Sequence, residues 1–376
     1  MIPEKFLKSL TAYDGPATLS AVPPGMDAFV LAELARAGRP VAYILSDGQR
    51  IVDIEQNLTF LAPDIPVLTL PGWDCLPYDR VSPGADVSAR RLEALSGLAA
   101  MHDNPHGAIV LVTVNAALQR VPPRDAIRQM GFSARAGSVI KMEDLAGRFE
   151  RLGFDRVATV REVGEYAVRG GILDAFLPGA DEPVRLDFFG DTLETIRNFD
   201  AVSQRTTGQV KELRLNAMSE VSLDPETVSR FRANYLRQFG AATRDDALYA
   251  AISEGRRFAG MEHWLPLFYE HLETVFDYLD GFRIVTDHVA VEAAGERREQ
   301  IVDYYQSRDE QLAQSKGQGI QAAPYKPVPP DALYLDQQEF SVTLDHSGSL
   351  RLSPFTEPET SVRKVFELDA HVGPRW

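Results

Sequence analysis

The side chains that most often carry out enzymatic chemistry are present in this chain, but they form no catalytic motif. The sequence contains no Gly-x-x-x-x-Gly-Lys-Ser/Thr loop, no Gly-x-Ser-x-Gly segment and no His-Glu-x-x-His helix. His102 and His106 have the four-residue spacing of a helical metal pair, but Asn104-Pro105 lies between them and breaks the helix that would align them. We therefore predict no catalytic residue and no metal site.

Cys75 and His263 are the remaining candidates for nucleophilic or acid–base chemistry, and both have apolar neighbours. Cys75 lies between Trp73 and Tyr78, and His263 lies within GMEHWLPLFY. Because such residues usually pack in a core, we interpret both as structural. As the single cysteine of the chain, Cys75 cannot form an internal disulfide, which favours a reducing cytoplasm.

One segment has the position of a phosphate-binding loop without its chemistry. Residues 18–30, TLSAVPPGMDAFV, read as a strand, a loop and a helix, the order that places backbone N–H groups around a phosphate. Pro23 and Pro24 remove two of these donors, and Asp27 places a carboxylate where a lysine is required. We predict a degenerate nucleotide loop (Pro23, Pro24, Gly25 and Asp27) that binds no ATP, and no cofactor for this chain.

The elements around this loop predict a parallel sheet covered by helices. Strand-sized apolar runs alternate with helical patterns, the strands at 18–22, 41–45, 66–70 and 108–114 and the helices at 27–38, 46–61 and 87–101. Strands that are apolar on both faces and alternate with helices are typical of an α/β fold. Residues 1–122 are predicted to form the first part of this domain.

The pattern changes after Pro122-Pro123. Residues 123–206 are mostly strand-like, with glycines at turn-like intervals, and the alternation over 157–162 predicts a partly solvated strand. This segment is predicted to be a small inserted α+β domain. Residues 207–330 return to a mixed pattern and are predicted to complete the first domain. The proline-rich stretch 316–330 has a linker composition, and residues 331–376 are predicted to be a linker or the start of another domain.

Composition restricts the class of function. Lys and Arg number 39 against 54 Asp and Glu, a net charge of −15, which excludes a protein that grips nucleic acid over its whole surface. Three local pairs keep weak, salt-sensitive nucleic-acid binding open as an alternative: Arg90-Arg91, Arg256-Arg257 and Arg297-Arg298. The longest apolar run, 108–114, is far shorter than the roughly 20 residues a membrane helix needs, so we expect no membrane contact and a cytoplasmic location.

Four segments carry a specific resemblance: LPGWDCLPYDRVSP (70–83), GEYAVRGGILDAFLPG (164–179), RLDFFGDTLETIRNFD (185–200) and GMEHWLPLFY (260–269). In this order they resemble the N-terminal region of the bacterial transcription-repair coupling factors, from near the start to about residue 345. The resemblance implies a cut-down relative of the excision-repair protein UvrB. Its fold would be a degenerate P-loop, helicase-like parallel-sheet domain with an inserted small UvrA-binding domain. Only residues 80–86 stand where UvrB inserts its DNA-clamping hairpin, so that hairpin is expected to be missing.

The resemblance also nominates contact residues on the inserted domain. Arg156 and Arg169 match positions that contact UvrA in the UvrB family, and a third such arginine position is Ala167 here. Arg161, Tyr166 and Phe176 are neighbouring candidates. For any single arginine, the alternative of a solvated strand residue stays open.

The implied role is recruitment of UvrA to stalled RNA polymerase in transcription-coupled nucleotide excision repair. In the family, RNA polymerase, duplex DNA, ATP and Mg²⁺ are handled by other domains of an ATP-dependent DNA translocase. This chain is therefore expected to be a non-enzymatic piece of a longer protein. Two other hypotheses remain: a weak nucleic-acid-binding fragment and a residual nucleotidase.

Overall fold

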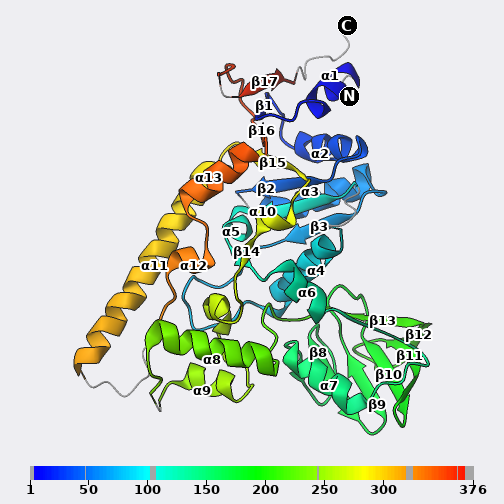
Figure 1. Cartoon of the computed structure of the whole chain (residues 1–376). Helices are drawn as coiled ribbons and strands as arrows, with labels where there is room; N and C mark the ends of the chain where they lie inside the picture. Colours follow the sequence, from blue (N-terminus) through cyan, green and yellow to red (C-terminus); the bar gives the residue numbers. More distant parts are fainter. Residues whose placement is uncertain are drawn as a thin grey trace.

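The larger unit of the chain is built on a seven-stranded sheet in which all paired neighbours run parallel (Figure 1). The computed structural model describes residues 4–46, 48–101, 107–243, 245–318, 325–361 and 363–368. In spatial order the strands are β17 (Lys364–Glu367), β1 (Ala17–Ser20), β16 (Leu350–Leu352), β15 (Arg283–Asp287), β2 (Val41–Leu45), β4 (Ile109–Thr113) and β3 (Val67–Leu70). This sheet confirms the predicted α/β fold class.

Two hydrophobic cores form on the two sides of the sheet because alternate strand residues point to opposite faces. On β2, Tyr43 joins one core, whereas Ala42 and Ile44 join the other. The first core is closed by α1 (Glu4–Thr11), α2 (Met26–Arg36) and α3 (Gln49–Leu61). The second is closed by α4 (Ala85–Met101), α5 (Val114–Ala117), α10 (Val275–Tyr278), α11 (Ala290–Gln318) and α13 (Gln337–His346).

A helical lobe extends the second core. It contains α8 (Pro225–Phe239), α9 (Ala247–Ser253) and the 3₁₀ helix η1 (Met261–Leu267). Phe231 of α8 stacks on Phe268 with ring centroids 4.7 Å apart, so aromatic packing joins α8 to the end of η1. The short strand β14 (Glu273–Thr274) pairs with β5 (Arg120–Val121) and ties the lobe to the parallel sheet.

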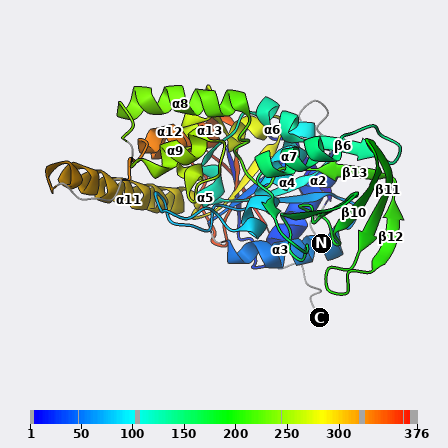
Figure 2. The ribbon, with the colours of Figure 1, turned by 90° about the horizontal axis from the view of Figure 1, so that it is seen from below.

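The small domain is a six-stranded sheet that is antiparallel except at one edge. Its strands are β12 (Thr206–Val210), β11 (Thr192–Phe199), β10 (Val184–Phe189), β9 (Ile172–Ala175), β8 (Glu165–Arg169) and β7 (Asp155–Arg156), in spatial order. Helix α7 (Met142–Arg151) covers one face, and α6 (Arg124–Met130) contacts α4 of the larger unit. A separate pair, β6 (Phe132–Arg135) and β13 (Glu212–Leu215), completes it. Figure 2 shows this domain and the free end of α11 at opposite ends of the molecule.

The structure moves two of the predicted boundaries. Strands β12 and β13 belong to the small domain, because β12 pairs with β11 and β13 pairs with β6, so the boundary at residue 206 is wrong. The predicted linker after residue 331 is also wrong for the described residues up to 368. It contains α13, β16 and β17, and α12 (Pro330–Leu333) overlaps its start. Strands β16 and β17 are only three and four residues long, so their own sequences give little indication of strands. They form because each pairs with β1, which lies between them.

Two smaller expectations also change. The alternating segment 157–162 is an irregular loop, because Val160 is buried against Ala167 and Phe199 and folds the segment over the sheet. In the proline-rich stretch 316–330, residues 319–324 lie outside the described residues. Tyr325 and Val328 in the same stretch are buried, which is core packing rather than a solvated linker.

A buried cluster of four side chains, here the Glu220 junction (Trp73, Arg91, Glu220 and Tyr269), lies where the small domain rejoins the larger unit. Arg91 Nε donates to Glu220 Oε1 at 2.7 Å, and Trp73 Nε1 donates to the same oxygen at 2.9 Å. The Tyr269 hydroxyl donates to the Glu220 carbonyl oxygen at 2.5 Å. Trp73 and Tyr269 come from two of the four resemblance segments, so at least these two residues have a structural role.

Candidate functional site

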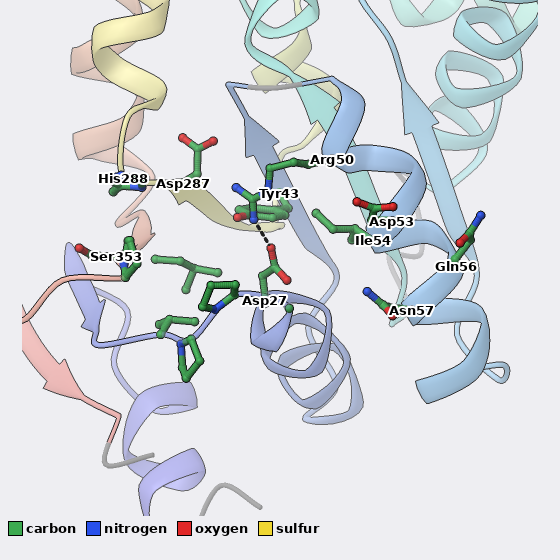
Figure 3. Close-up of a pocket in the computed structure, with 16 residues that line it drawn as sticks. Asp27, Tyr43, Arg50, Asp53, Ile54, Gln56, Asn57, Asp287, His288 and Ser353 are labelled. Atoms are coloured by element: carbon green, nitrogen blue, oxygen red, sulfur yellow. Dashed lines mark hydrogen bonds and ion pairs between the residues drawn. The ribbon is translucent and has the colours of Figure 1, made fainter. Parts of the chain in front are cut away.

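The degenerate nucleotide loop lines a cavity of about 480 Å³ (Figure 3). The cavity lies at the carboxyl ends of β1, β2, β15 and β16, between the start of α2 and the side of α3. Open α/β sheets bind ligands at this edge, so the position agrees with that of a nucleotide site. The position alone says nothing of the ligand, which depends on the groups that line the cavity.

The lining groups are unsuited to phosphate. Pro23 and Pro24 bring no N–H groups, and Gly25 precedes α2 with a φ of 84° and no side-chain cap. Asp27 is buried and forms an ion pair with Arg50 of α3, so this arginine is already engaged (Figure 3). Burial is the main cause that raises the pKa of the neighbouring Tyr43 hydroxyl, which therefore stays neutral.

The charge of the cavity is negative. Asp53 and Asp287 line it in addition to the Asp27–Arg50 pair. Asp287 Oδ2 accepts from the Ser46 N–H at 2.8 Å and from the Ser46 hydroxyl at 2.6 Å. Carboxylates on both sides of the cavity would repel phosphate groups, which supports the predicted lack of ATP binding without testing it.

The second candidate surface is the face of the small-domain sheet that α7 leaves open. The pairing of the strands shows which side chains lie on each face of this sheet. Leu173, Leu186 and Ile196 lie on one face and join the core beneath α7. The opposite side carries the set that we call the open arginine face, which comprises Arg169, Asp174, Arg185, Asp187, Phe189 and Arg197. Arg185 and Asp187 alternate with the apolar residues Val184 and Leu186 along β10, so the strand period assigns these charges to the open face.

Asp174 is the buried centre of this face. It accepts a hydrogen bond from Arg169 Nη2 at 2.6 Å and two from Arg185, through Nε at 2.7 Å and Nη2 at 2.9 Å. The Asp174 contacts hold the pKa of the Arg185 guanidinium above its ordinary value. Beside this group, Arg197 binds Asp187 through Nε at 2.9 Å and Nη2 at 2.8 Å. Paired, charge-assisted bonds of this type fix guanidinium planes in place.

Exposure divides the arginines of this face. The Arg185 side chain is 16% exposed and lies over the Phe199 ring at 4.6 Å, whereas the Arg169 side chain is 49% exposed. Arg169 contacts Asp174 through Nη2, from the end of the strand, with half of its side chain at the surface. Arg185 is therefore largely enclosed by the fold, whereas half of the Arg169 side chain is accessible at the surface.

The predicted contact residues do not share one face. Arg156 is exposed on β7 and pairs in register with Tyr166, so it lies on the side opposite to Arg169. Arg161 is exposed in the loop 157–163, where its N–H donates to Glu165 Oε2 at 2.7 Å. A partner that contacts Arg156 and Arg169 together has to span the β7–β8 edge of the sheet.

Tyr166 needs a correction. It is 2% exposed and stacks on Phe149 of α7 at 5.6 Å, so it is a core residue without a surface for a partner. Burial raises the pKa of its hydroxyl. Phe176 is partly buried against the cluster of Val160, Ala167 and Phe199.

Arg185 and Arg197 were missed by the sequence analysis. The two-residue spacing of Arg185 and Asp187 within RLDFF was the available signal, because it predicts one charged strand face.

The arginine pairs proposed for nucleic acid do not form an exposed basic stripe. Arg91 is fully buried against Glu220. Arg257 pairs with Glu262 at 3.1 Å, Arg256 pairs with Glu254 at 2.6 Å, and Arg298 pairs with Asp331. Four of the six arginines are thus paired with carboxylates of the chain itself, which weakens the nucleic-acid alternative.

The other chemically active residues are packed. Cys75 Sγ lies 3.9 Å from His263 Nε2, and burial raises the thiol pKa to about 12 and lowers the imidazole pKa to about 4. Neither a thiolate nor an imidazolium is therefore available near neutral pH, in agreement with structural roles. His102 and His106 lie outside the described residues. Within the described ranges, no cluster of His, Cys, Asp and Glu is arranged to hold a metal ion, and no helix is long and apolar enough to cross a membrane.

Comparisons with known proteins agree with this division of the chain. Residues 132–220 match the family described as the UvrB interaction domain. The chain is 31% identical over 324 residues to the transcription-repair-coupling factor of Haemophilus influenzae, which covers 85% of the chain and 27% of that protein. It is 31% identical over 315 residues to the factor of Escherichia coli K12, with 83% and 26% covered. The factor of Myxococcus xanthus is 38% identical over 266 residues, with 66% and 22% covered. The chain thus spans about a quarter of the length of these relatives.

Proposed function

The chain is homologous to the N-terminal region of the transcription-repair-coupling factors and contains a UvrB interaction domain, and we propose that its small domain docks the excision-repair protein UvrA. The docking surface is the open arginine face together with the adjoining β7–β8 edge. Arg169 is the principal contact, and Arg156 reaches the partner from the other side of the edge.

The observation that carries this proposal is the geometry at Asp174. Arg185 binds the buried carboxylate with two hydrogen bonds, so the charge of Asp174 stays compensated while Arg169 offers half of its side chain to a partner. Arginine is the charged side chain best suited to interfaces, because its planar guanidinium forms paired bonds with carboxylates. A partner carboxylate at Arg169 would complete such a pair.

Within the longer relatives, this docking would bring UvrA to RNA polymerase stalled in transcription-coupled nucleotide excision repair. ATP-driven movement on DNA would belong to parts of the relatives outside the matched region. This chain would itself have no nucleotidase activity, because its loop has prolines in place of N–H donors and an acidic cavity.

The test is calorimetric titration of UvrA into the chain without ATP. We expect direct binding, and we expect Arg169→Ala to weaken it by about 10-fold or more. Alanine is preferable to glutamate here, since a carboxylate at position 169 would lie beside the buried Asp174 and confound folding with binding. Unchanged affinity of a folded double variant, Arg169→Ala with Arg156→Ala, would refute the assignment.

A further inference from the structure

We propose that the cavity at the carboxyl ends of β1, β2, β15 and β16 binds an organic cation, a guanidinium group on a short apolar chain. The cavity is separate from the proposed UvrA surface, because it lies in the larger unit and the open arginine face lies in the small domain. The same groups that oppose phosphate there suit a ligand of the opposite charge.

The cavity has the size and the apolar lining of a small-molecule site. Its volume of about 480 Å³ falls within the range of about 300–1,000 Å³ that is usual for ligand pockets. Its apolar lining residues are Val22, Pro23, Pro24, Ile54, Leu352 and Pro354. An apolar ligand segment therefore has side chains to pack against, and the polar groups of the cavity select its head group.

Three carboxylates line the cavity from three different elements. Asp27 belongs to α2, Asp53 to α3 and Asp287 to the end of β15. Figure 3 shows them on different sides of Tyr43 and Arg50. Among the described lining residues Arg50 is the one arginine or lysine, and Asp27 already pairs with it. No ion pair with a described residue compensates Asp53 or Asp287, so the cavity has a negative field that attracts a cation.

Asp287 shows that a hydrogen-bond donor is missing in this region. The residue is 3% exposed, and its Oδ2 accepts both hydrogen bonds from Ser46. Its Oδ1 is buried and has no hydrogen-bond partner among the described residues. A buried carboxylate oxygen without a donor is costly, and an N–H group of a ligand in the cavity would supply one. A guanidinium suits this place because it presents several N–H donors in one plane.

An exposed aromatic ring lies beside the cavity. Phe355 is 63% exposed, and its ring centroid lies 5.5 Å from that of His288, which lines the cavity. Backbone hydrogen bonds fix its position, because the Ala21 N–H donates to the Phe355 carbonyl at 3.0 Å and the Phe355 N–H donates to the Ser353 hydroxyl at 3.2 Å. Guanidinium groups stack on aromatic rings, so Phe355 adds a second kind of contact to the carboxylates.

A guanidinium can come from a free small molecule or from an arginine side chain of a polypeptide, and the experiment distinguishes the two. Butylguanidinium is the free probe, butylurea is its neutral analogue of similar shape, and the capped tripeptide Gly-Arg-Gly is the polypeptide probe. Saturation-transfer NMR titration of the whole chain measures each affinity. We expect butylguanidinium to bind with a Kd of about 1 mM or tighter, and butylurea to bind at least about 10-fold more weakly.

Two variants and a matched control locate the site. Asp287→Asn keeps an acceptor for the Ser46 donors but loses the buried charge, so it should weaken binding by about 30-fold or more. Asp53 is exposed, so Asp53→Asn carries little risk to folding and should weaken binding by about 2- to 5-fold. Asp303→Asn removes the same charge from the exposed surface of α11 and should bind like the wild type. Melting temperatures show which variants are folded.

Binding that depends on the probe's charge, is weakened in the cavity variants and is unchanged in Asp303→Asn supports the proposal. The relative affinities of butylguanidinium and the tripeptide then identify the source that the cavity prefers. Absence of binding by both cationic probes overturns the proposal, and so does equal binding of butylurea. Unchanged affinity of the folded cavity variants also overturns it. If Asp287→Asn does not fold, Asp53→Asn decides alone.

Discussion

The Glu220 junction and the open arginine face both contain arginine–carboxylate pairs, but these pairs differ in burial. Each contains an arginine with two hydrogen bonds to a buried carboxylate and an aromatic ring against its guanidinium. At the junction both partners are buried, with Arg91 at 0% and Glu220 at 4% side-chain exposure. This pair is therefore inaccessible to a partner and only connects parts of the fold. On the open face Asp174 is buried, but Arg169 remains half exposed. The two sites therefore differ in the exposure of their arginines: the Arg91 side chain is fully buried, whereas half of the Arg169 side chain is accessible, as our proposed docking surface requires.

The largest effect is expected at the junction. Glu220→Ala would leave the Arg91 guanidinium buried without its carboxylate, which costs about 3–5 kcal/mol of unfolding free energy. Urea denaturation monitored by circular dichroism measures this loss. Arg90→Ala on the exposed side of α4 is the control and should change stability by less than about 0.5 kcal/mol. If the unfolding free energy of Glu220→Ala stays within about 1 kcal/mol of the wild-type value, the Arg91–Glu220 pair contributes no more than an exposed ion pair does, and the prediction is wrong.

Low pH should lower the free energy of unfolding through His263, which packs against Trp73 of the Glu220 junction. Burial lowers the pKa of His263 to about 4, below its ordinary value of 6.5, because the neutral ring is 1% exposed beside Trp73. The neutral form is favoured by the fold, so this contribution is complete above pH 6.5 and is lost as pH falls towards 4. The full loss is about 3 kcal/mol. It is measured as the stability difference from His263→Gln, which should shrink as pH falls from 7 to 4; a constant difference would contradict it.

The parallel sheet shows which strands the sequence could and could not predict. Strands such as β2 and β4 were predictable because they are apolar on both faces, which marks a buried parallel strand. Strands β16 and β17 were not, since their formation depends on pairing with β1 rather than on their own pattern.

The same limit applies to the site. Arg169 could be nominated from the resemblance, but the Asp174 contact and the burial of Tyr166 depend on pairing between strands. Arg90 and Arg91 are adjacent in the sequence, yet one is exposed and the other is fully buried.

Within the open face, the two arginines at Asp174 should respond differently. Arg185→Ala removes two hydrogen bonds from the buried carboxylate and the contact with Phe199, so we expect a loss of about 1–3 kcal/mol in stability. Arg169→Ala leaves both Arg185 bonds in place and should cost less than about 0.5 kcal/mol. Thermal and urea unfolding of the two variants test the difference. Equal losses would show that Arg169 is a structural residue like Arg91.

The smallest expected effect is that of ATP, which should be zero. The cavity at the carboxyl end of β1 lies at the edge where α/β sheets bind ligands, but the groups that line it oppose phosphate. Pro23 and Pro24 lack N–H donors, the charge of Arg50 is engaged by Asp27, and Asp287 adds a further carboxylate.

Melting of the chain with and without ATP and Mg²⁺ is a sensitive test, because a ligand at 100 times its Kd would stabilise the fold by about 2.7 kcal/mol. We expect no shift for the wild type. We also expect none for Asp27→Asn, because removing one carboxylate restores neither the missing N–H groups nor a free cation. A magnesium-dependent rise in melting temperature for either protein would show that the cavity still binds the nucleotide.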